Sequence, residues 1–406
     1  MMKRKLFKQI KNDWRENVWF IVELMVVFPV IWYLVAMLYL QTKDTFLPRG
    51  FDHENVYVGD PSYVSDKSPK HVESEENGYL NDLEEIVRSL SKNPNVESVA
   101  ITDSYPYNYN FMGNNLMLLD EVDSVSYYGN TRTATPEYID VLKIKSRTGK
   151  TREQLKAMLA RGEVLISDND FYNELGRDPM NLIGKRMYYG SDSSDVYRIG
   201  DVIEKIRRND YENTSGGTIL MPITEENKAW ADIILRVKDG RGAYLLDDFT
   251  NNPELNSHRN VYLTSLQSMD DIRESNQRSI VLSIRSRVMI MVFLLVTIFL
   301  GLLGSFWYRM QQRTGEIAIR KICGARRRDI FARVISEGMI LLLIAAVPAT
   351  ACVLPFASDY LTMPVVAYIC TGLVALAIVA LGIILSLWYP ARKAMSIEPA
   401  EAIKTE

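Results

Sequence analysis

Apolar positions gather in four long stretches, and most of the polar residues lie in one large region between the first two stretches. A bilayer core of about 30 Å needs roughly 20 apolar residues in a helix. The stretches that meet this length are residues 18–40, 288–308, 338–356 and 365–388. The last three contain no Asp, Glu, Lys or Arg, and a charge at mid-membrane costs about 2.5 to 3.5 kcal/mol. We therefore predict four transmembrane helices.

The first stretch follows a basic segment and could be mistaken for a cleaved signal peptide. Its apolar run is too long for that, and residues 41–44 (Gln-Thr-Lys-Asp) offer no small-residue cleavage site. We expect it to remain as an anchor. Glu23 lies inside this stretch, about one and a half turns from Val18. It is either hydrated at the membrane surface or functional.

Lys and Arg residues are distributed unevenly among the short segments beside the spans. Residues 1–17 carry six and residues 309–337 carry eight, and the tail, residues 389–406, adds three, whereas residues 357–364 carry none. Since basic loops stay in the cytoplasm, we predict cytoplasmic termini and a cytoplasmic loop at 309–337. Residues 41–287 would then lie outside the bacterial inner membrane.

The large polar region is acidic, with forty Asp and Glu against thirty Lys and Arg. Nucleic-acid binding needs a basic face, so this balance argues against it. The three cysteines lie outside this region, at positions 323, 352 and 370. The fold of the region must therefore depend on a hydrophobic core instead of disulfides.

Two βα(β) units are predicted within the polar region, and we expect them to pair into one α+β subdomain. Apolar residues between 80 and 90 recur at helical spacing and lead into a strand at 96–101. The order recurs later as a strand, a helix and a strand, at 233–237, 243–249 and 261–266.

A mostly β subdomain is predicted to be inserted between these units, at about residues 131–228. It contains short apolar runs separated by Gly, Asp and Asn, at 163–167, 186–189, 197–203 and 218–221. Residues 63–78 are polar, and we expect a mobile loop there.

A stalk helix is predicted from about residue 268, before the second span. Ser268 and Asp271 form a capping-box pattern, and no Pro or Gly interrupts residues 268–300. The apolar positions that we assign to the stalk are Ile272, Ile280 and Ile284. The alternative is an ordinary amphipathic helix packed on its own domain.

Two motifs resemble those of the MacB/FtsX-type (type VII) ABC transporter permease family. Residues 313–326 read Arg-Thr-Gly-Glu-Ile-Ala-Ile-Arg-Lys-Ile-Cys-Gly-Ala-Arg, and residues 389–403 contain Pro-Ala-Arg-Lys-Ala followed by Glu-Pro-Ala-Glu-Ala-Ile. Segments at 134–142, 163–167, 178–184 and 197–203 are similar to the family's periplasmic core domain.

The resemblance implies that the basic loop holds a coupling helix that docks on an ATPase subunit. Its motif residues in this chain are Gly315, Glu316, Ile317, Ile319, Arg320, Lys321, Gly324 and Ala325. Ile317, Ile319, Ile322 and Cys323 would form its apolar side, and Gly324 would end the helix. A basic amphipathic helix lying on anionic lipid would satisfy the same pattern.

No catalytic or metal site is predicted. The chain has no Gly-x-x-x-x-Gly-Lys-Ser/Thr phosphate loop, and its three histidines are scattered. ATP and Mg²⁺ would therefore be bound by a separate ATPase, and this chain would hold no cofactor.

The resemblance further implies a second permease chain, identical or paralogous, within membrane lipid, and in some members a periplasmic adaptor or outer-membrane component. The expected function is mechanical work by the outer domain, such as efflux of antibiotics or peptides or extraction of lipoproteins. The alternatives are a regulator of a cell-wall hydrolase or signalling protein resembling FtsX, and an anchored receptor without an ATPase.

Overall fold

The computed structural model describes residues 14–73, 78–108, 114–119, 126–167, 178–189, 195–211, 218–228, 230–312, 315, 317, 319, 322–360 and 363–396. The chain divides into two compact units. The helical unit comprises Met1–Lys43 and Val281–Glu406, and the sheet unit comprises Asp44–Ile280.

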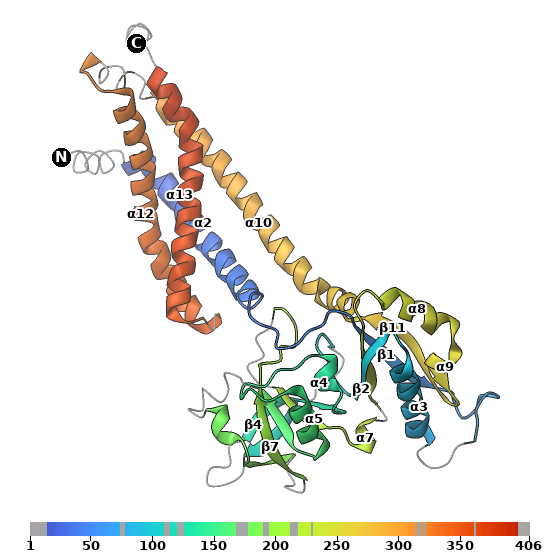
Figure 1. The fold of residues 1–406 in the computed structure, drawn as a ribbon. Helices are drawn as coiled ribbons and strands as arrows, with labels where there is room; N and C mark the ends of the chain where they lie inside the picture. The colour runs from blue at the N-terminus through green and yellow to red at the C-terminus, as the bar shows by residue number, and fades with distance from the viewer. Residues whose placement is uncertain are drawn as a thin grey trace. The chain divides into compact units, whose positions relative to one another are not determined.

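Within the described part of the chain, four helices are long and apolar enough to cross a membrane. They are α2 (Trp14–Thr42), α10 (Met269–Gln312), α12 (Arg327–Tyr360) and α13 (Val365–Ser396) (Figure 1). Each contains one of the four predicted spans. The helix α10 is uninterrupted over 44 residues, so its first turns belong to the sheet unit and its remainder to the helical unit.

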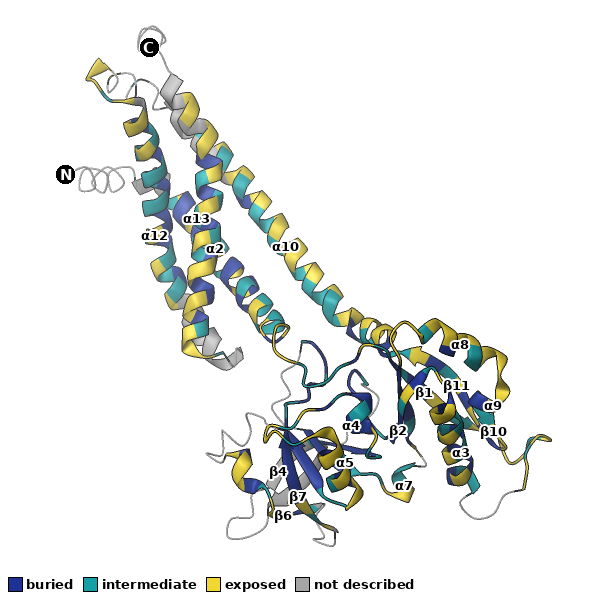
Figure 2. Cartoon of the chain, viewed as in Figure 1, coloured by how far each residue is buried: buried dark blue, intermediate teal, exposed yellow. Residues whose placement is uncertain are grey.

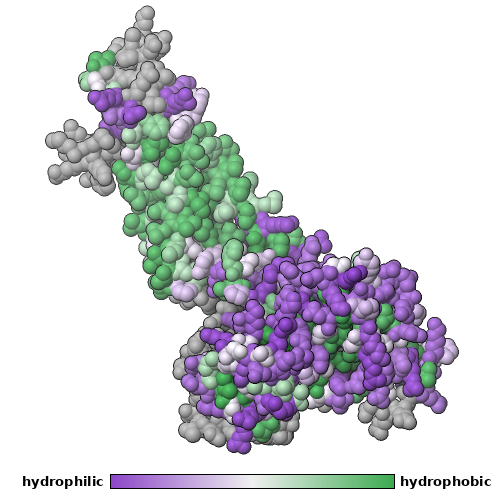
Figure 3. Space-filling view, in the orientation of Figure 1, coloured by the Kyte–Doolittle hydropathy of each residue, from purple (hydrophilic) through white to green (hydrophobic). Residues whose placement is uncertain are grey.

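The helical unit has a buried apolar core and an apolar surface as well. Leu24, Ile31, Leu341 and Leu342 are fully buried between α2, α12 and α13. Large apolar side chains also stand exposed on these helices, among them Val26, Val347 and Leu373. Figure 2 shows buried residues in dark blue and exposed residues in yellow along the same helices. Figure 3 shows this apolar surface as a green band over the helices. In water such a patch would be costly, so the surface suits lipid or another apolar helix.

The helices α2 and α13 make close contact at a glycine. Trp32 is buried, its Nε1 donates to Thr371 Oγ1 at 3.3 Å, and its ring lies 4.6 Å from that of Tyr368. A Cβ added at Gly372 would lie 2.7 Å from Trp32 Cζ2. Only glycine therefore allows the Trp32 ring to lie against α13 in this way.

The sheet unit contains one 11-stranded sheet in the order β10-β11-β1-β9-β2-β4-β3-β6-β7-β5-β8. The strands of its first part are β1 (Val56–Tyr63), β2 (Val96–Thr102), β9 (Asp232–Val237), β10 (Ser257–His258) and β11 (Val261–Ser268). The helices connecting them are α3 (Gly78–Lys92), α8 (Gly242–Asn251) and α9 (Pro253–Asn256).

This first part consists of two βαβ units, β1-α3-β2 and β9-α8-β11, whose strands interleave as β11-β1-β9-β2. This is the split βαβ arrangement. The predicted α+β subdomain is therefore present, and α3, β2, β9, α8 and β11 each contain their predicted segments. The strand β1 was not predicted, since Val-Tyr-Val-Gly-Asp-Pro-Ser-Tyr contains a glycine and a proline.

Alternate residues of these strands pack on opposite faces of the sheet. Val58, Ile234 and Ala100 lie in register and join one buried cluster, whereas Ile233 and Leu235 join the cluster beneath α3. This period of two is the pattern expected of a sheet buried on both faces.

The second part of the sheet contains six strands. They are β3 (Asn114–Leu119), β4 (Ser126–Ala134), β5 (Val164–Ser167), β6 (Arg186–Tyr189), β7 (Asp195–Ile203) and β8 (Thr218–Pro222). Short helices accompany them, namely α4 (Tyr138–Val141), α5 (Arg152–Ala160), η1 (Pro179–Leu182) and α7 (Glu225–Lys228). The four strands predicted for the insert agree with β5, β6, β7 and β8, and β4 crosses the predicted start of the insert at residue 131.

The two parts of the sheet meet at a narrow waist. The strands β2 and β4 are paired through Thr102 and Ala134 alone. Thr102 Oγ1 donates to the carbonyl oxygen of Thr133 at 2.9 Å, which reinforces this short pairing. The buried cluster around Val58 also includes Leu165 and Leu220 from the second part, so one core extends past the waist.

Part of the predicted mobile loop is tied to the sheet unit. The amide nitrogen of Val64 donates to the carbonyl oxygen of Asn260, and the Asn260 side chain exchanges two hydrogen bonds with the Val72 backbone. Residues 74–77 of that loop lie outside the described residues.

Candidate functional site

The predicted coupling loop connects α10 to α12. Ile317 is buried, 5% exposed, and packs with Ile330 and Ala325. Ile319 and Ile322 are about 60% exposed. The predicted apolar side is thus divided, because residues two apart lie on opposite sides of a helix. Gly315 is half-buried, whereas Glu316, Arg320 and Lys321 lie outside the described residues.

The end of this segment is defined by its backbone. Cys323 N donates to the carbonyl oxygen of Ile319 at 3.0 Å, and Gly324 adopts φ +90°. A glycine in this left-handed conformation terminates helices, as the sequence predicted. Asp329 then accepts from Arg326 N at 3.2 Å, which fixes the start of α12. The two exposed isoleucines therefore lie in the last turn before a defined helix end.

Aromatic rings join α10, α12 and α13 near this loop. Trp307 stacks on Tyr389 with a centroid separation of 5.4 Å, and Lys393 Nζ lies 4.1 Å from the centre of the Trp307 ring. Phe331 meets Trp388 edge to face at 5.7 Å. The tail motif thus packs against the helix that precedes the loop. Sequence reasoning identified the motif and missed these contacts, although Trp and Tyr are enriched at membrane interfaces.

The predicted stalk residues lie in the first turns of α10. Asp271 N donates to Ser268 Oγ at 3.1 Å, so the predicted cap is present. Ile272 is buried in the sheet unit beside Met269, and Ile280 and Ile284 are half-buried. The helix is therefore packed on the sheet unit at its start, as the alternative interpretation requires, and it also continues without a break into the second span.

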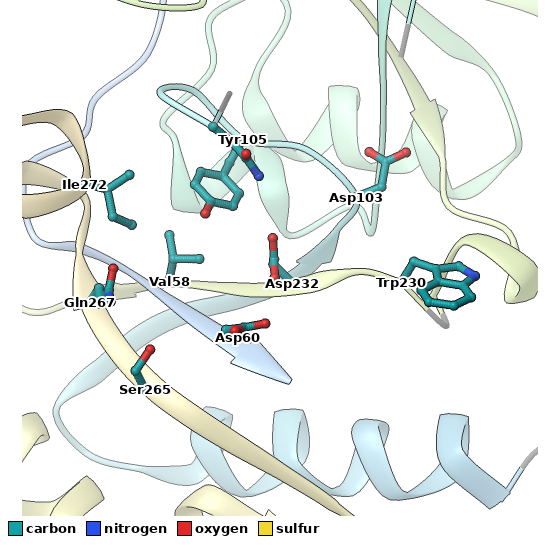
Figure 4. A pocket seen from close by; sticks show the side chains of 10 residues that line it. Val58, Asp60, Asp103, Tyr105, Trp230, Asp232, Ser265, Gln267 and Ile272 are labelled. Atoms are coloured by element: carbon teal, nitrogen blue, oxygen red, sulfur yellow. The ribbon is translucent and has the colours of Figure 1, made fainter. Parts of the chain in front are cut away.

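A cavity of about 330 Å³ lies on the face of the sheet opposite α3. Figure 4 shows its lining, which comes from β1, β9, β11, the loop after β2 and the start of α10. Three carboxyl groups line it, from Asp60, Asp103 and Asp232, together with the rings of Tyr105 and Trp230. These residues are far apart in the sequence and carry no common motif.

The cavity alters the protonation of its carboxyl groups. Burial, with smaller contributions from the nearby Asp60 and Asp103, raises the pKa of Asp232 to about 7. Burial also raises the pKa of Asp103, although Asp103 accepts a hydrogen bond from Thr133 N at 2.8 Å. The arrangement can therefore take up and release one proton near neutral pH. Among the described residues no group of His, Cys, Asp and Glu could hold a metal ion.

Comparisons with known proteins concern different parts of the chain. Residues 288–399 match the family described as FtsX-like permease C-terminal. A curated relative from Pseudomonas fluorescens, named "Probable export ATP-binding/permease protein", is 27% identical over 187 residues. The match covers 42% of this chain and 27% of the relative, so the chain spans about a quarter of the relative's length.

Two solved structures are similar to this chain at low sequence identity. The periplasmic region of MacB from Actinobacillus actinomycetemcomitans is 13% identical with a TM-score of 0.33, and the match covers 57% of this chain and 97% of that one. The extracellular domain of the transporter YknZ from Gram-positive bacteria is 12% identical with a TM-score of 0.30, at coverages of 51% and 100%.

The FtsX-like match covers the second, third and fourth apolar helices, the coupling loop and most of the tail motif. This match contains the first of the two motifs on which the resemblance was based and most of the second, and that resemblance is confirmed. Residues 288–399 of this chain are therefore similar to the C-terminal part of FtsX-like permeases, in agreement with the resemblance to the MacB/FtsX type.

Proposed function

We propose that this chain is the permease subunit of an ABC-type transporter, that a separate cytosolic ATPase drives it, and that residues 315–325 dock on that ATPase. The observation that carries this proposal is the division of the loop. Ile317 is buried against Ile330 and Ala325, whereas Ile319 and Ile322 are exposed on the surface. Burying an isoleucine side chain contributes about 1.5 to 3 kcal/mol of favourable free energy. Two exposed isoleucines just before a defined helix end would therefore bind well in an apolar cleft of a partner protein.

The proposal of a separate ATPase rests on the chemistry of the sequence. The chain has no phosphate loop, whose glycine-rich backbone and lysine hold the nucleotide phosphates. The Pseudomonas relative carries both ATP-binding and permease in its name, and this chain spans about a quarter of it. We therefore expect this chain alone to hydrolyse no ATP and to hold no cofactor, with ATP and Mg²⁺ bound by the partner.

The helix α10 is suited to transmit movement from the loop. It ends at Gln312, just before the loop, and it begins at Met269, directly after the last strand of the sheet. A displacement of the docked loop would act on one end of a continuous helix whose other end is packed on the sheet unit. The resulting work on material outside the membrane, such as efflux or extraction, is our proposal for the activity.

A second permease chain is part of the proposal. Along the predicted second span, α10 exposes Met289, Phe293, Val296 and Leu300, and these residues share one helical face. Such a face must be covered by lipid or by another apolar helix. Four spans in one chain are few for a translocating unit, so we expect two copies or two paralogues to work together.

The docking proposal is tested by copurification from gentle detergent at equal membrane expression. Replacing Ile319 and Ile322 together by Ser should reduce recovery of the ATPase at least about tenfold, because both side chains would leave the interface. The matched control is Arg328→Gln in the first turn of α12, directly after the loop, which should leave recovery nearly unchanged. If the segment lay on anionic lipid instead, losing this one basic residue would weaken its membrane binding by only about 1 kcal/mol.

A second variant tests the charged residues of the motif. Glu316→Ala with Arg320→Ala should also lose the ATPase, since removing buried interface charges commonly costs about 2 to 5 kcal/mol. Undiminished recovery in both double variants would mean that the loop does not dock, and the permease mechanism would lose its transmission step.

A further inference from the structure

The carboxyl group of Asp210 binds two arginines that come from distant segments. Arg49 Nε lies 2.7 Å from one carboxyl oxygen, and Arg273 Nε lies 2.6 Å from the other. The Asp210 side chain is only 4% exposed, whereas the Arg49 and Arg273 side chains are 36% and 35% exposed. All three residues belong to the sheet unit.

Further hydrogen bonds connect Asp210 with α10, directly and through Tyr107. Tyr107 donates its hydroxyl to Asp210 at 3.1 Å, and Asn276 donates its amide to the carbonyl oxygen of Tyr107 at 2.6 Å. Gln277 is buried, and with its amide nitrogen turned toward Asp210 it donates to the carboxyl group at 3.3 Å. Residues 273, 276 and 277 share one helical face, so the first turns of α10 are held on that face.

The segment that carries Asp210 also holds the chain that follows α2. Arg207 is buried, and its Nη1 donates to the carbonyl oxygen of Leu47 at 3.1 Å. The backbone nitrogen of Arg207 donates to the carbonyl oxygen of Arg49 at 3.0 Å. Gly50 adopts φ +77°, and a Cβ there would lie 2.0 Å from the carbonyl oxygen of Lys205. Residues 47–50 therefore lie directly against residues 205–207.

Two chain segments connect the sheet unit with the helical unit, one after α2 and one through α10. Both of them contact residues 205–210. This stretch follows β7, in the second part of the sheet, whereas α10 is joined covalently to β11, in the first part. Burial alone would raise the pKa of Asp210, but the two guanidinium groups lower it to about 2, so Asp210 is ionised at any physiological pH.

We propose that Asp210 is a positioning residue that clamps both connecting segments to residues 205–210, so that a movement of α10 reaches the second part of the sheet as well as the first. The inference rests on the proposed function for its role in transport. The clamp itself is a property of the sheet unit and is tested without a partner.

The test measures distances between pairs of spin labels in the purified full chain, after replacing the native cysteines by Ser. One label is at Glu153→Cys on α5. It is paired with a second label at Arg278→Cys on α10 or at Phe46→Cys after α2, and we call these two combinations the clamp pairs. All three positions are exposed. The reference pair, Arg88→Cys with Tyr244→Cys, lies on α3 and α8 and reports whether the first part of the sheet is intact.

Asp210→Ala should widen the distance distributions of both clamp pairs at least about twofold, since each connecting segment loses its ion pair with Asp210. The reference pair should stay narrow. Unchanged widths at both clamp pairs, with the reference pair narrow, would overturn the proposal.

A second variant decides the case in which Asp210→Ala also widens the reference pair. Arg273→Gln removes only the ion pair between α10 and Asp210. The distance distribution of the clamp pair on α10 should therefore widen, while that of the clamp pair at Phe46 stays narrow. Unchanged width at the α10 pair in this variant would overturn the clamp.

The link to transport is tested separately. With the ATPase present, Asp210→Ala should leave copurification within about twofold of the unsubstituted chain and should reduce transport about tenfold or more. Unimpaired transport in this variant would contradict the role in coupling. Failure of the unsubstituted chain to recover any ATPase would instead contradict the proposed function and leave the distance measurements valid.

Discussion

Trp307 on α10 stacks on Tyr389 of α13, with the ring planes 9° apart and the ring centres 5.4 Å apart. Lys393, one turn beyond Tyr389, places its ammonium 4.1 Å from the centre of the same Trp307 ring. The tail motif is thus held against the helix that leads into the coupling loop.

Trp307→Ala should free the end of α13. The aromatic pair and the cation–π contact contribute roughly 0.5 to 1.5 and 0.5 to 1 kcal/mol, so tryptic cleavage after Lys393 should become about tenfold faster. The rate is followed by mass spectrometry on the chain in detergent. Trp19→Ala removes a tryptophan that is 74% exposed and serves as the control. Equal cleavage rates in both variants would show that the stack does not hold the tail.

Gly372→Ala should destabilise the contact between α2 and α13. The new Cβ would lie 2.7 Å from a carbon of the rigid, buried Trp32 ring, and overpacking of this kind costs about 1 to 3 kcal/mol. Unfolding in mixed micelles measures the loss. Gly382→Ala is the matched control on the same helix, since nothing lies within 4 Å of its Cβ. Adding Trp32→Leu to Gly372→Ala should restore part of the stability, and an unchanged loss would contradict this account.

Asp232 should make the chain less stable as the pH rises. Its folded pKa is raised to about 7 by burial and by Asp60 and Asp103, and its unfolded value is about 3.9. Its contribution is therefore complete below about pH 4 and is lost as the pH rises through 7. Between pH 5 and pH 8 we expect the unsubstituted chain to lose about 2 to 3 kcal/mol of stability through this group, and Asp232→Asn should not show this loss.

Melting temperatures of the full chain at the two pH values measure this effect. Asp60→Asn should weaken it in part, because one repelling carboxylate is removed. Parallel pH dependence in the unsubstituted chain and in Asp232→Asn would contradict the assignment.

A cysteine at Ser68 should react with an impermeant maleimide in intact cells, in a background without the native cysteines. This follows from the distribution of basic residues, which predicts that residues 41–287 lie outside the cytoplasm. A cysteine at Arg328, in the first turn of α12, should react only after the inner membrane is opened. The reverse pattern would invert the predicted orientation.

The features that the sequence predicted well have strong local signals. The four spans follow from apolar length, and β9 and β11 follow from dense β-branched and aliphatic runs beside turn residues. The start of α10 follows from the Ser268 and Asp271 pair, because a helix cap is encoded within four residues. Gly324 was placed correctly for the same reason.

The features that were missed depend on residues far apart in the chain. Arg49 and Arg273 reach Asp210 across 161 and 63 positions, and no local pattern relates them. The strand β1 contains Gly59 and Pro61 and is stabilised by its neighbours β9 and β11, so its own propensity did not reveal it. The division of Ile317 from Ile319 depends on packing against Ile330, which lies beyond the loop.

The narrow waist at Thr102 and Ala134 has a mechanical consequence. When many residues of two strands are paired, their hydrogen bonds share a pulling force. The strand β2 is paired with β9 over most of its length, whereas it is paired with β4 through a single residue pair. Tension applied across the sheet would therefore concentrate at Thr102 and Ala134. If the chain were stretched between the two parts of the sheet, the ladder pair at Thr102 and Ala134 would break before the pairing of β2 with β9, and the buried cluster that both parts share would then bear the load.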